Sequence, residues 1–185
     1  TVSVAASQTL FTCADIGYNA IDLTVIDSSG NIGTCTAQVT IVDSVPPVAI
    51  CKDLTVYLDP SGIGIIHPSD LDNGSSDVCD FSSLVASDTV FTCVDIGLNI
   101  ETLIFTDHYG NTGICKSLVT VVDVMPPVAR CKPIAVYLDQ TGFASLLPND
   151  LNEGSSDACG LASFATSDST FTCNDVGPNY VTLTV

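Results

Sequence analysis

Carboxylates are the first set of residues in this sequence that can carry chemistry. The 185-residue chain has 21 acidic residues against four Lys and Arg, a formal net charge of −17. Only Glu101 and Glu153 are glutamates, and every other acidic residue is an aspartate. Short Asp side chains bond to their own backbone in turns and also form compact oxygen cages around hard cations such as calcium. Phosphate binding needs Lys and Arg, so the composition argues against a nucleic-acid partner.

Cysteines are the second set. Four cysteines per period, in a recurring frame, are typical of a disulfide framework in an oxidising compartment. A zinc site would need close pairs such as C-x-x-C, whereas the successive gaps within one period are 28, 14 and 22 residues. Disulfides are therefore favoured over zinc. All nine cysteines follow one 80-residue period: Cys13, Cys93 and Cys173; Cys35 and Cys115; Cys51 and Cys131; Cys79 and Cys159.

The same period extends through the rest of the sequence. Phe-Thr-Cys occurs at 11–13, 91–93 and 171–173, and the double proline at 46–47 returns at 126–127. We place the start of each module at the Asp before the double proline. Residues 1–42 are then the C-terminal half of one module, 43–122 a complete module, and 123–185 the N-terminal part of a third. We expect the chain to belong to a longer array.

The elements that position these residues are predicted to be strands. Apolar side chains alternate with period two in segments such as Leu103–Phe105 and Val119–Val121, and no segment shows a helical stripe. Segments 54–59 and 62–66 are predicted strands joined by a Pro-Ser turn. Asp-x-x-Gly-Asn, at 27–31 and 107–111, is predicted to be a hairpin loop. This pattern indicates an all-β chain of tandem antiparallel β-sandwich modules.

Four cysteines per module allow three pairings. We favour Cys51–Cys115, because the start of the first strand and the last hairpin share one end of a sandwich. We also favour Cys79–Cys93, which flank a short apolar stretch with an Ala-Ser-Asp turn, and the period repeats this pair as Cys159–Cys173. Under this scheme Cys13, Cys35 and Cys131 have partners outside the sequence.

Several aspartates recur from one copy to the next. In a sandwich the loop 70–77, the hairpin 107–111 and the linker at Asp43 converge at one end of the module. Carboxylates gathered there without Lys or Arg repel one another unless a cation neutralises them. Turn formation alone also explains recurrent Asp, but this convergence favours calcium. The predicted ligands are Asp27, Asn31, Asp43, Asp70, Asp72, Asp77, Asp107, Asn111, Asp123, Asp150, Asn152 and Asp157.

Other polar residues give weaker signals. Asp59 and Asp139 lie beside turns at the opposite end of the module and are interpreted as structural. The aspartates of the Cys-x-Asp-x-Gly turn, such as Asp95, fit a ligand and a turn equally well. His67 and His108 do not recur, and nothing resembles a nucleophile elbow, so we do not expect an enzyme.

Three motifs resemble a known family. They are Asp-x-x-Pro-Pro-Val-Ala-x-Cys-Lys from Asp43, Phe-Thr-Cys-x-Asp-x-Gly-x-Asn from Phe91, and Thr-Asp-x-x-Gly-Asn-x-x-x-Cys-x-x-x-Val-Thr-Val-Val-Asp from Thr106. Together they resemble the hyalin repeat (HYR) domain, in its bacterial cell-surface, tandem-repeat form. The resemblance implies an immunoglobulin-like sandwich, an extracellular or cell-surface location, roles in adhesion or surface fibres, and no catalytic residues. Members commonly join the first-strand and last-strand cysteines, which agrees with Cys51–Cys115.

These observations predict a structural protein. We expect an extracellular fibre, stalk or surface array, stapled by disulfides and stiffened by calcium, whose partners are neighbouring repeats and further copies of itself. The alternative is a cell-surface adhesin module that binds a glycan or protein. The loops are among the most similar parts of the copies, which favours a scaffold over a receptor.

Overall fold

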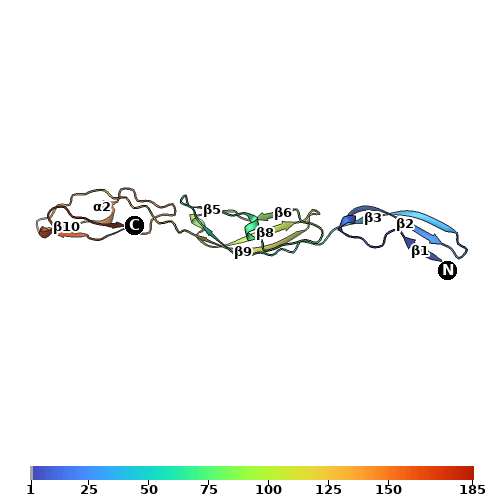
Figure 1. Ribbon diagram of the computed structural model, residues 1–185. Helices are drawn as coiled ribbons and strands as arrows, with labels where there is room; N and C mark the ends of the chain where they lie inside the picture. Colours follow the sequence, from blue (N-terminus) through green and yellow to red (C-terminus); the bar gives the residue numbers. More distant parts are fainter. Residues whose placement is uncertain (1) are drawn as a thin grey trace. The chain divides into compact units, whose positions relative to one another are not determined.

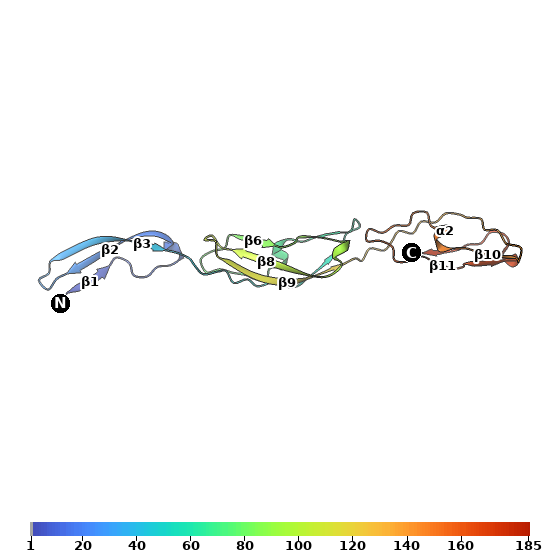
Figure 2. The same ribbon diagram turned by 180° about the vertical axis from the view of Figure 1, so that it is seen from behind.

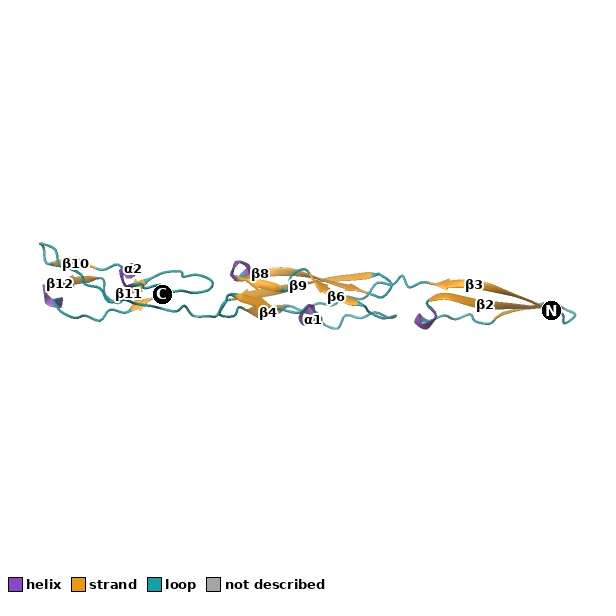
Figure 3. Cartoon of the chain, turned by 90° about the horizontal axis from the view of Figure 1, so that it is seen from above, coloured by secondary structure: helices purple, strands orange, loops and turns teal. Residues whose placement is uncertain are grey.

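The computed structural model describes residues 2–185, and the chain is all-β (Figure 1). Strands account for 42% of the residues and helices for 9%. The helical segments are all a single turn long, as the colouring of Figure 3 shows. The prediction of an all-β chain is confirmed.

The first part of the chain forms one three-stranded antiparallel sheet. It contains β1 (Ser3–Ala6), the 3-10 helix η1 (Cys13–Asp15), β2 (Gly17–Ile26) and β3 (Ile32–Ile41). The sheet order is β1-β2-β3, with Gly17 opposite Ile41 and Ile26 opposite Ile32. The loop at 27–31 therefore closes a hairpin, as the Asp-x-x-Gly-Asn pattern predicted. Most side chains of β3 are exposed.

The middle of the chain is the richest in strands. Its elements are β4 (Leu54–Tyr57), β5 (Ile63–Ile65), α1 (Pro68–Leu71), β6 (Ser83–Ala86), β7 (Val90–Thr92), η2 (Cys93–Asp95), β8 (Gly97–Thr106) and β9 (Thr112–Val122). One sheet has the order β4-β9-β8-β6, and Figure 2 labels β9, β8 and β6 of it. β5 pairs with β7 in a second sheet. The Pro-Ser turn between β4 and β5 thus leads from one sheet to another and closes no hairpin.

Alternation of side chains explains which faces of these strands are buried. Leu103 and Phe105 on β8 are buried, and so are Val119 and Val121 on β9, while their neighbours in sequence are more exposed. Period-two patterning places every second side chain on one face of a strand. The residues picked out by their alternation are therefore the buried ones.

The last part of the chain has shorter strands. It contains β10 (Phe143–Ser145), α2 (Pro148–Leu151), β11 (Ala165–Thr166), β12 (Thr170–Thr172), η3 (Cys173–Asp175) and β13 (Leu183–Thr184). β10 pairs with β12, and β11 pairs with β13. A small core gathers around Leu146, Leu151, Phe171 and Leu183.

The single-turn helices were not predicted from the sequence, and local hydrogen bonds account for them. In η2 the Asp95 carboxylate accepts hydrogen bonds from the backbone N–H and the hydroxyl of Thr92, at 2.8 and 3.0 Å. In α1 the Asp70 carboxylate accepts the backbone N–H of His67 at 2.8 Å, just before Pro68. Capping of this kind satisfies donors at a helix start without any amphipathic stripe. It also gives Asp95 a role in the turn.

The chain divides into two compact units. The first comprises the chain up to Leu54 with His67–Asp88 and Ile100–Leu118. The second comprises Thr55–Ile66, Thr89–Asn99 and Val119–Val185. The module boundaries at 43 and 123 stay a prediction, because the units divide the chain differently.

Candidate metal centre

Three aspartates from separate segments come together in the first unit. Asp43 follows β3, Asp77 lies in the loop between α1 and β6, and Asp107 follows β8. One carboxylate oxygen from each lies within 4.8 Å of the others. Asp43 and Asp107 are buried, with 8% and 3% of their surface exposed, and Asp77 is half-buried. We call these three residues the carboxylate cluster.

Asp107 is held by its own hairpin loop. Its Oδ1 accepts the backbone N–H groups of Tyr109 and Asn111, each at 2.8 Å, and its Oδ2 accepts the Asn111 side-chain amide at 2.7 Å. Burial by itself raises the pKa of Asp107, but these hydrogen bonds, with the Asn111 amide foremost, outweigh it and leave the pKa below its usual value. Asp107 is therefore held as a carboxylate.

Asp43 is held by the linker on one side only. Its Oδ1 accepts the backbone N–H of Val45 at 3.0 Å, and its carbonyl oxygen accepts the Asn111 amide at 3.3 Å. Its Oδ2 is buried and has no hydrogen-bond partner. A buried polar atom left unsatisfied costs roughly 1–3 kcal/mol, and more when it is charged. An oxygen in this position is the ligand that a bound cation would satisfy.

Asp77 reaches the cluster because its loop is bonded to the linker. The backbone groups of Val48 and Ser76 exchange two hydrogen bonds, at 2.8 and 3.0 Å. The Asp77 Oδ1 then accepts the N–H groups of Cys79 at 2.8 Å and Asp80 at 3.2 Å. One carboxylate oxygen of Asp77 lies within 4.8 Å of an oxygen of each of the other two aspartates.

The electrostatics of the cluster favour a cation. Two carboxylates about 4 Å apart repel by roughly 4 kcal/mol at an effective dielectric of about 20. The only ion pair within residues 2–185 joins His108 to Asp80 at 3.8 Å, both exposed, so no Lys or Arg neutralises the cluster. Calcium prefers carboxylate and carbonyl oxygens and accepts irregular geometry. Its two charges would offset most of the three negative charges.

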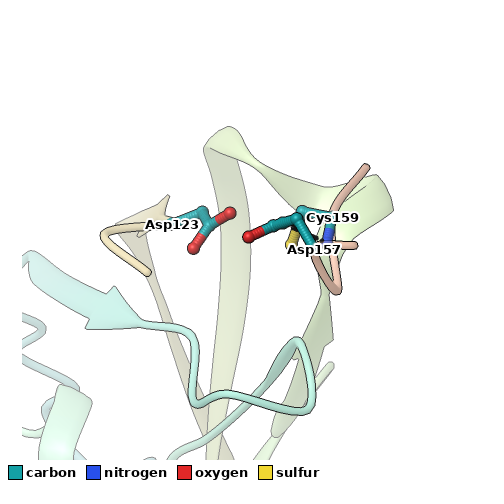
Figure 4. Close-up of side chains that lie close together, drawn as sticks. All are labelled: Asp123, Asp157 and Cys159. Atoms are coloured by element: carbon teal, nitrogen blue, oxygen red, sulfur yellow. Dashed lines mark hydrogen bonds between the residues drawn. The ribbon is translucent and has the colours of Figure 1, made fainter. Parts of the chain in front are cut away.

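A second group lies in the second unit. Figure 4 shows the carboxylates of Asp123 and Asp157 pointing toward one another, with Cys159 beside Asp157. These aspartates stand 80 residues after Asp43 and Asp77, and they keep the same bonds: Asp123 accepts the Met125 N–H at 2.9 Å, and Asp157 accepts the Cys159 N–H at 2.8 Å. The sulfur of Cys159 is in a disulfide, so it is no thiolate ligand. This group supplies two carboxylates.

The other predicted ligands lie in turns outside the cluster. Asn111 supports Asp43 and Asp107 through its amide nitrogen. Asp70 and Asp150 cap α1 and α2. Asp72 and Asn152 accept the N–H groups of Ser75 and Ser155, each at 2.9 Å. Asp27 and Asn31 bond to each other in the first hairpin, at 2.7 Å between their side chains. None of these seven residues belongs to the carboxylate cluster.

The disulfides differ in part from the predicted pairing. Cys51–Cys115 is present, with the two Cα atoms 5.8 Å apart. The predictions of Cys79–Cys93 and Cys159–Cys173 are wrong, because Cys79 is bonded to Cys13 and Cys159 to Cys93. Cys13 therefore has a partner within the chain, contrary to expectation. Among residues 2–185, Cys35, Cys131 and Cys173 are exposed and in no disulfide.

The error has a physical cause. The predicted Cys79–Cys93 pair lies within one copy of the sequence period. Both observed bonds instead join cysteines 66 residues apart that belong to successive copies. A recurring glycine in the sequence is a sign of the observed Cys93–Cys159 bond. Gly62 recurs as Gly142, and a Cβ on Gly62 would lie 2.7 Å from the Cys93 sulfur. Its φ of +78° lies in the region that favours glycine. Because Gly62 has no side chain, it leaves the space beside the Cys93 sulfur that the disulfide occupies.

A cavity lies elsewhere, in the second unit. It has a volume of about 690 Å³ and is lined by the segment 132–138 and by Leu146, Leu151 and Phe171. It is thus an open side of the small apolar core. The carboxylate groups do not line it.

Comparison with known proteins gives no family. No family model matches the chain, and no curated protein matches it. No helix within residues 2–185 is both long enough and apolar enough to cross a membrane.

Proposed function

We propose that this chain is a structural extracellular protein built from tandem immunoglobulin-like β-sandwich modules with an 80-residue period, similar to HYR domains. Successive modules are joined by disulfides and by calcium, and the whole forms a fibre, stalk or surface array. An oxidising compartment accounts for three disulfides in a chain of this size.

The observation that carries the proposal is the pair of disulfides across the period. Cys13–Cys79 and Cys93–Cys159 have the same separation, 66 residues, and the second bond joins the residues that stand 80 positions after those of the first. Such a bond constrains the unfolded chain by roughly 4 kcal/mol in the loop-entropy model. A receptor module needs no covalent bond to its neighbour, whereas a load-bearing array gains from one.

The carboxylate cluster gives calcium its place in this proposal. Asp43 lies in the linker that opens the proposed module 43–122, and Asp77 and Asp107 lie in two loops of that module. A cation held by all three fixes the linker to those loops. The second group, at Asp123 and Asp157, repeats the linker-to-loop arrangement with two carboxylates. Calcium stiffening at each junction therefore rests on the same two recurring positions.

Electron microscopy of the native material in calcium and in chelator tests the proposal. We expect long, thin, protease-resistant particles in calcium that soften or shorten in chelator. Compact particles of a few modules, unchanged by calcium, would contradict it and favour an adhesin module instead. Peptide mapping without reduction provides the covalent test, and it should yield a linked peptide that contains Cys13 and Cys79.

A further inference from the structure

The turn that carries Asp77 also carries an inter-repeat disulfide. Asp77 and Cys79 are two residues apart, and the Asp77 Oδ1 accepts the Cys79 N–H at 2.8 Å. Cys79 is bonded to Cys13, whose sulfur lies 3.6 Å from the carbonyl oxygen of the intervening Val78. The three-residue turn Asp77–Cys79 is therefore fixed at one end by the disulfide and faces the carboxylate cluster at the other.

The disulfide and a bound cation would also close the same stretch of chain. The disulfide joins Cys13 to Cys79, and a cation in the cluster would join Asp43 to Asp77, inside that loop. With the disulfide intact, Asp77 is kept near Asp43, and the effective concentration of its carboxylate is high. Once the disulfide is reduced, a cation must pay more of the cost of ordering this loop itself.

We propose that cation binding at the cluster and the Cys13–Cys79 disulfide are coupled, so that each stabilises the other. This rests on the proposed cation site. In the oxidised chain one carboxylate oxygen of Asp77 lies within 4.8 Å of a carboxylate oxygen of Asp43, whose Oδ2 is buried and unpartnered, and a divalent cation needs oxygens gathered in this way. By thermodynamic reciprocity, the factor by which reduction weakens cation binding is the factor by which the cation opposes reduction.

The redox step is reduction by a dithiol. One thiolate of the dithiol attacks a sulfur of the disulfide and forms a mixed disulfide. The second thiolate then closes the ring of the dithiol and releases the other protein sulfur. Two electrons and two protons pass to Cys13 and Cys79, which become thiols, and the dithiol becomes a cyclic disulfide.

The chain contains its own graded comparison. Cys13–Cys79 adjoins a cluster of three carboxylates, Cys93–Cys159 adjoins a group of two, and neither Cys51 nor Cys115 belongs to either group. Calcium should protect the three disulfides against reduction in this order. It should be strongest for Cys13–Cys79, weaker for Cys93–Cys159 and absent for Cys51–Cys115.

The test is a redox titration of the whole chain in dithiothreitol buffers, with calcium or with chelator. Thiol trapping and mass spectrometry give the reduced fraction of each cysteine. We expect calcium to lower the equilibrium constant for reduction of Cys13–Cys79 about tenfold, within the usual range of coupling. For a two-electron couple, this is a shift of about 30 mV. Asp43→Asn should remove that shift and leave the response of Cys93–Cys159 unchanged.

Calcium binding measured by calorimetry on the oxidised chain separates the two ways of failing. If no calcium binds, the cation site itself is wrong. If calcium binds but the three disulfides respond alike or not at all, the site stands and the coupling is overturned. Binding with the expected order of protection supports both.

Discussion

Two hairpin loops with the same motif differ in what surrounds them. In the first, Asp27 accepts hydrogen bonds from Ser29 and Asn31 at 2.8 and 2.9 Å, and from the Asn31 amide at 2.7 Å. In the second, Asp107 accepts the equivalent bonds from Tyr109 and Asn111 at 2.8, 2.8 and 2.7 Å. The motif therefore builds the same turn both times.

Only the second hairpin belongs to a carboxylate cluster. Asp27 is exposed, whereas Asp107 is buried and lies beside Asp43 and Asp77. The Asp-x-x-Gly-Asn motif is thus a turn device by itself. It becomes part of the carboxylate cluster where a linker and a second loop pack against it. The first hairpin is accordingly a matched control for the second.

The largest difference between the two hairpins is expected when the glycine in the strand after each loop is replaced by alanine. A Cβ on Gly113 would overlap the carbonyl oxygen of Pro47, whereas a Cβ on Gly33, 80 residues earlier, meets nothing within 4 Å. Gly113→Ala should lower the free energy of unfolding by about 2–3 kcal/mol, because the linker must shift. Gly33→Ala should change it by less than about 0.5 kcal/mol. Urea unfolding of both variants checks this, and equal losses would show that the linker does not pack on the second hairpin.

Removal of one charge from each hairpin is the next test. Asp107→Asn should weaken calcium binding at least about tenfold, the scale on which loss of a metal-site group acts. Asp27→Asn should leave it unchanged, because Asp27 belongs to neither of the acidic groups found within residues 2–185. Calorimetry with calcium measures both, and a loss of affinity in Asp27→Asn would remove the distinction between the hairpins.

Acid sensitivity gives the smallest expected effect. Hydrogen bonds from the Ser61 hydroxyl, and then from the N–H groups of Ile63 and Ser61, lower the pKa of Asp59 below 3.8. Asp139 has the same pattern, with the Thr141 hydroxyl as the leading donor. Because their folded pKa values are depressed, the stability they contribute is present above pH 3.8 and is lost as pH falls through the lower folded values.

The check on this effect is chelator-treated protein, in which the cluster contributes no bound cation. Asp59→Asn and Asp139→Asn should each flatten the fall of unfolding midpoint below pH 4. Asp53→Asn, with its single backbone hydrogen bond from Leu118, is the control. An unchanged acid slope in the first two variants would contradict the role given to these turns.

The sequence predicts the elements better than it predicts their contacts. Period-two alternation located the buried faces of β8 and β9, and turn chemistry located both hairpins. The single-turn helices were missed because a capping Asp beside a proline leaves no amphipathic stripe. Cys13–Cys79 was missed because periodicity shows which positions are equivalent but not which copies touch.

The sequence predicted which segments form the candidate site, whereas packing determines which of their aspartates belong to it. Convergence of the linker, the 70–77 loop and the second hairpin was expected from sandwich topology. Asp70 and Asp72 lie on that same loop, yet their oxygens serve backbone N–H groups, at 2.8 and 2.9 Å. The sequence cannot distinguish Asp70 and Asp72 from Asp77. Membership of the cluster depends on the Val48–Ser76 backbone hydrogen bonds, which hold the Asp77 end of the loop against the linker.

The central claim is that the carboxylate cluster binds a cation, and Asp43→Asn tests it most directly. Its Oδ1 keeps the Val45 bond, and the new amide replaces the unpartnered Oδ2. In chelator, the variant should be more stable than the wild type by about 1–3 kcal/mol, because a buried charge is removed. With calcium at a hundred times its Kd, the wild type should gain about 2.7 kcal/mol and the variant far less. Equal stability of the wild type in calcium and in chelator would contradict the account.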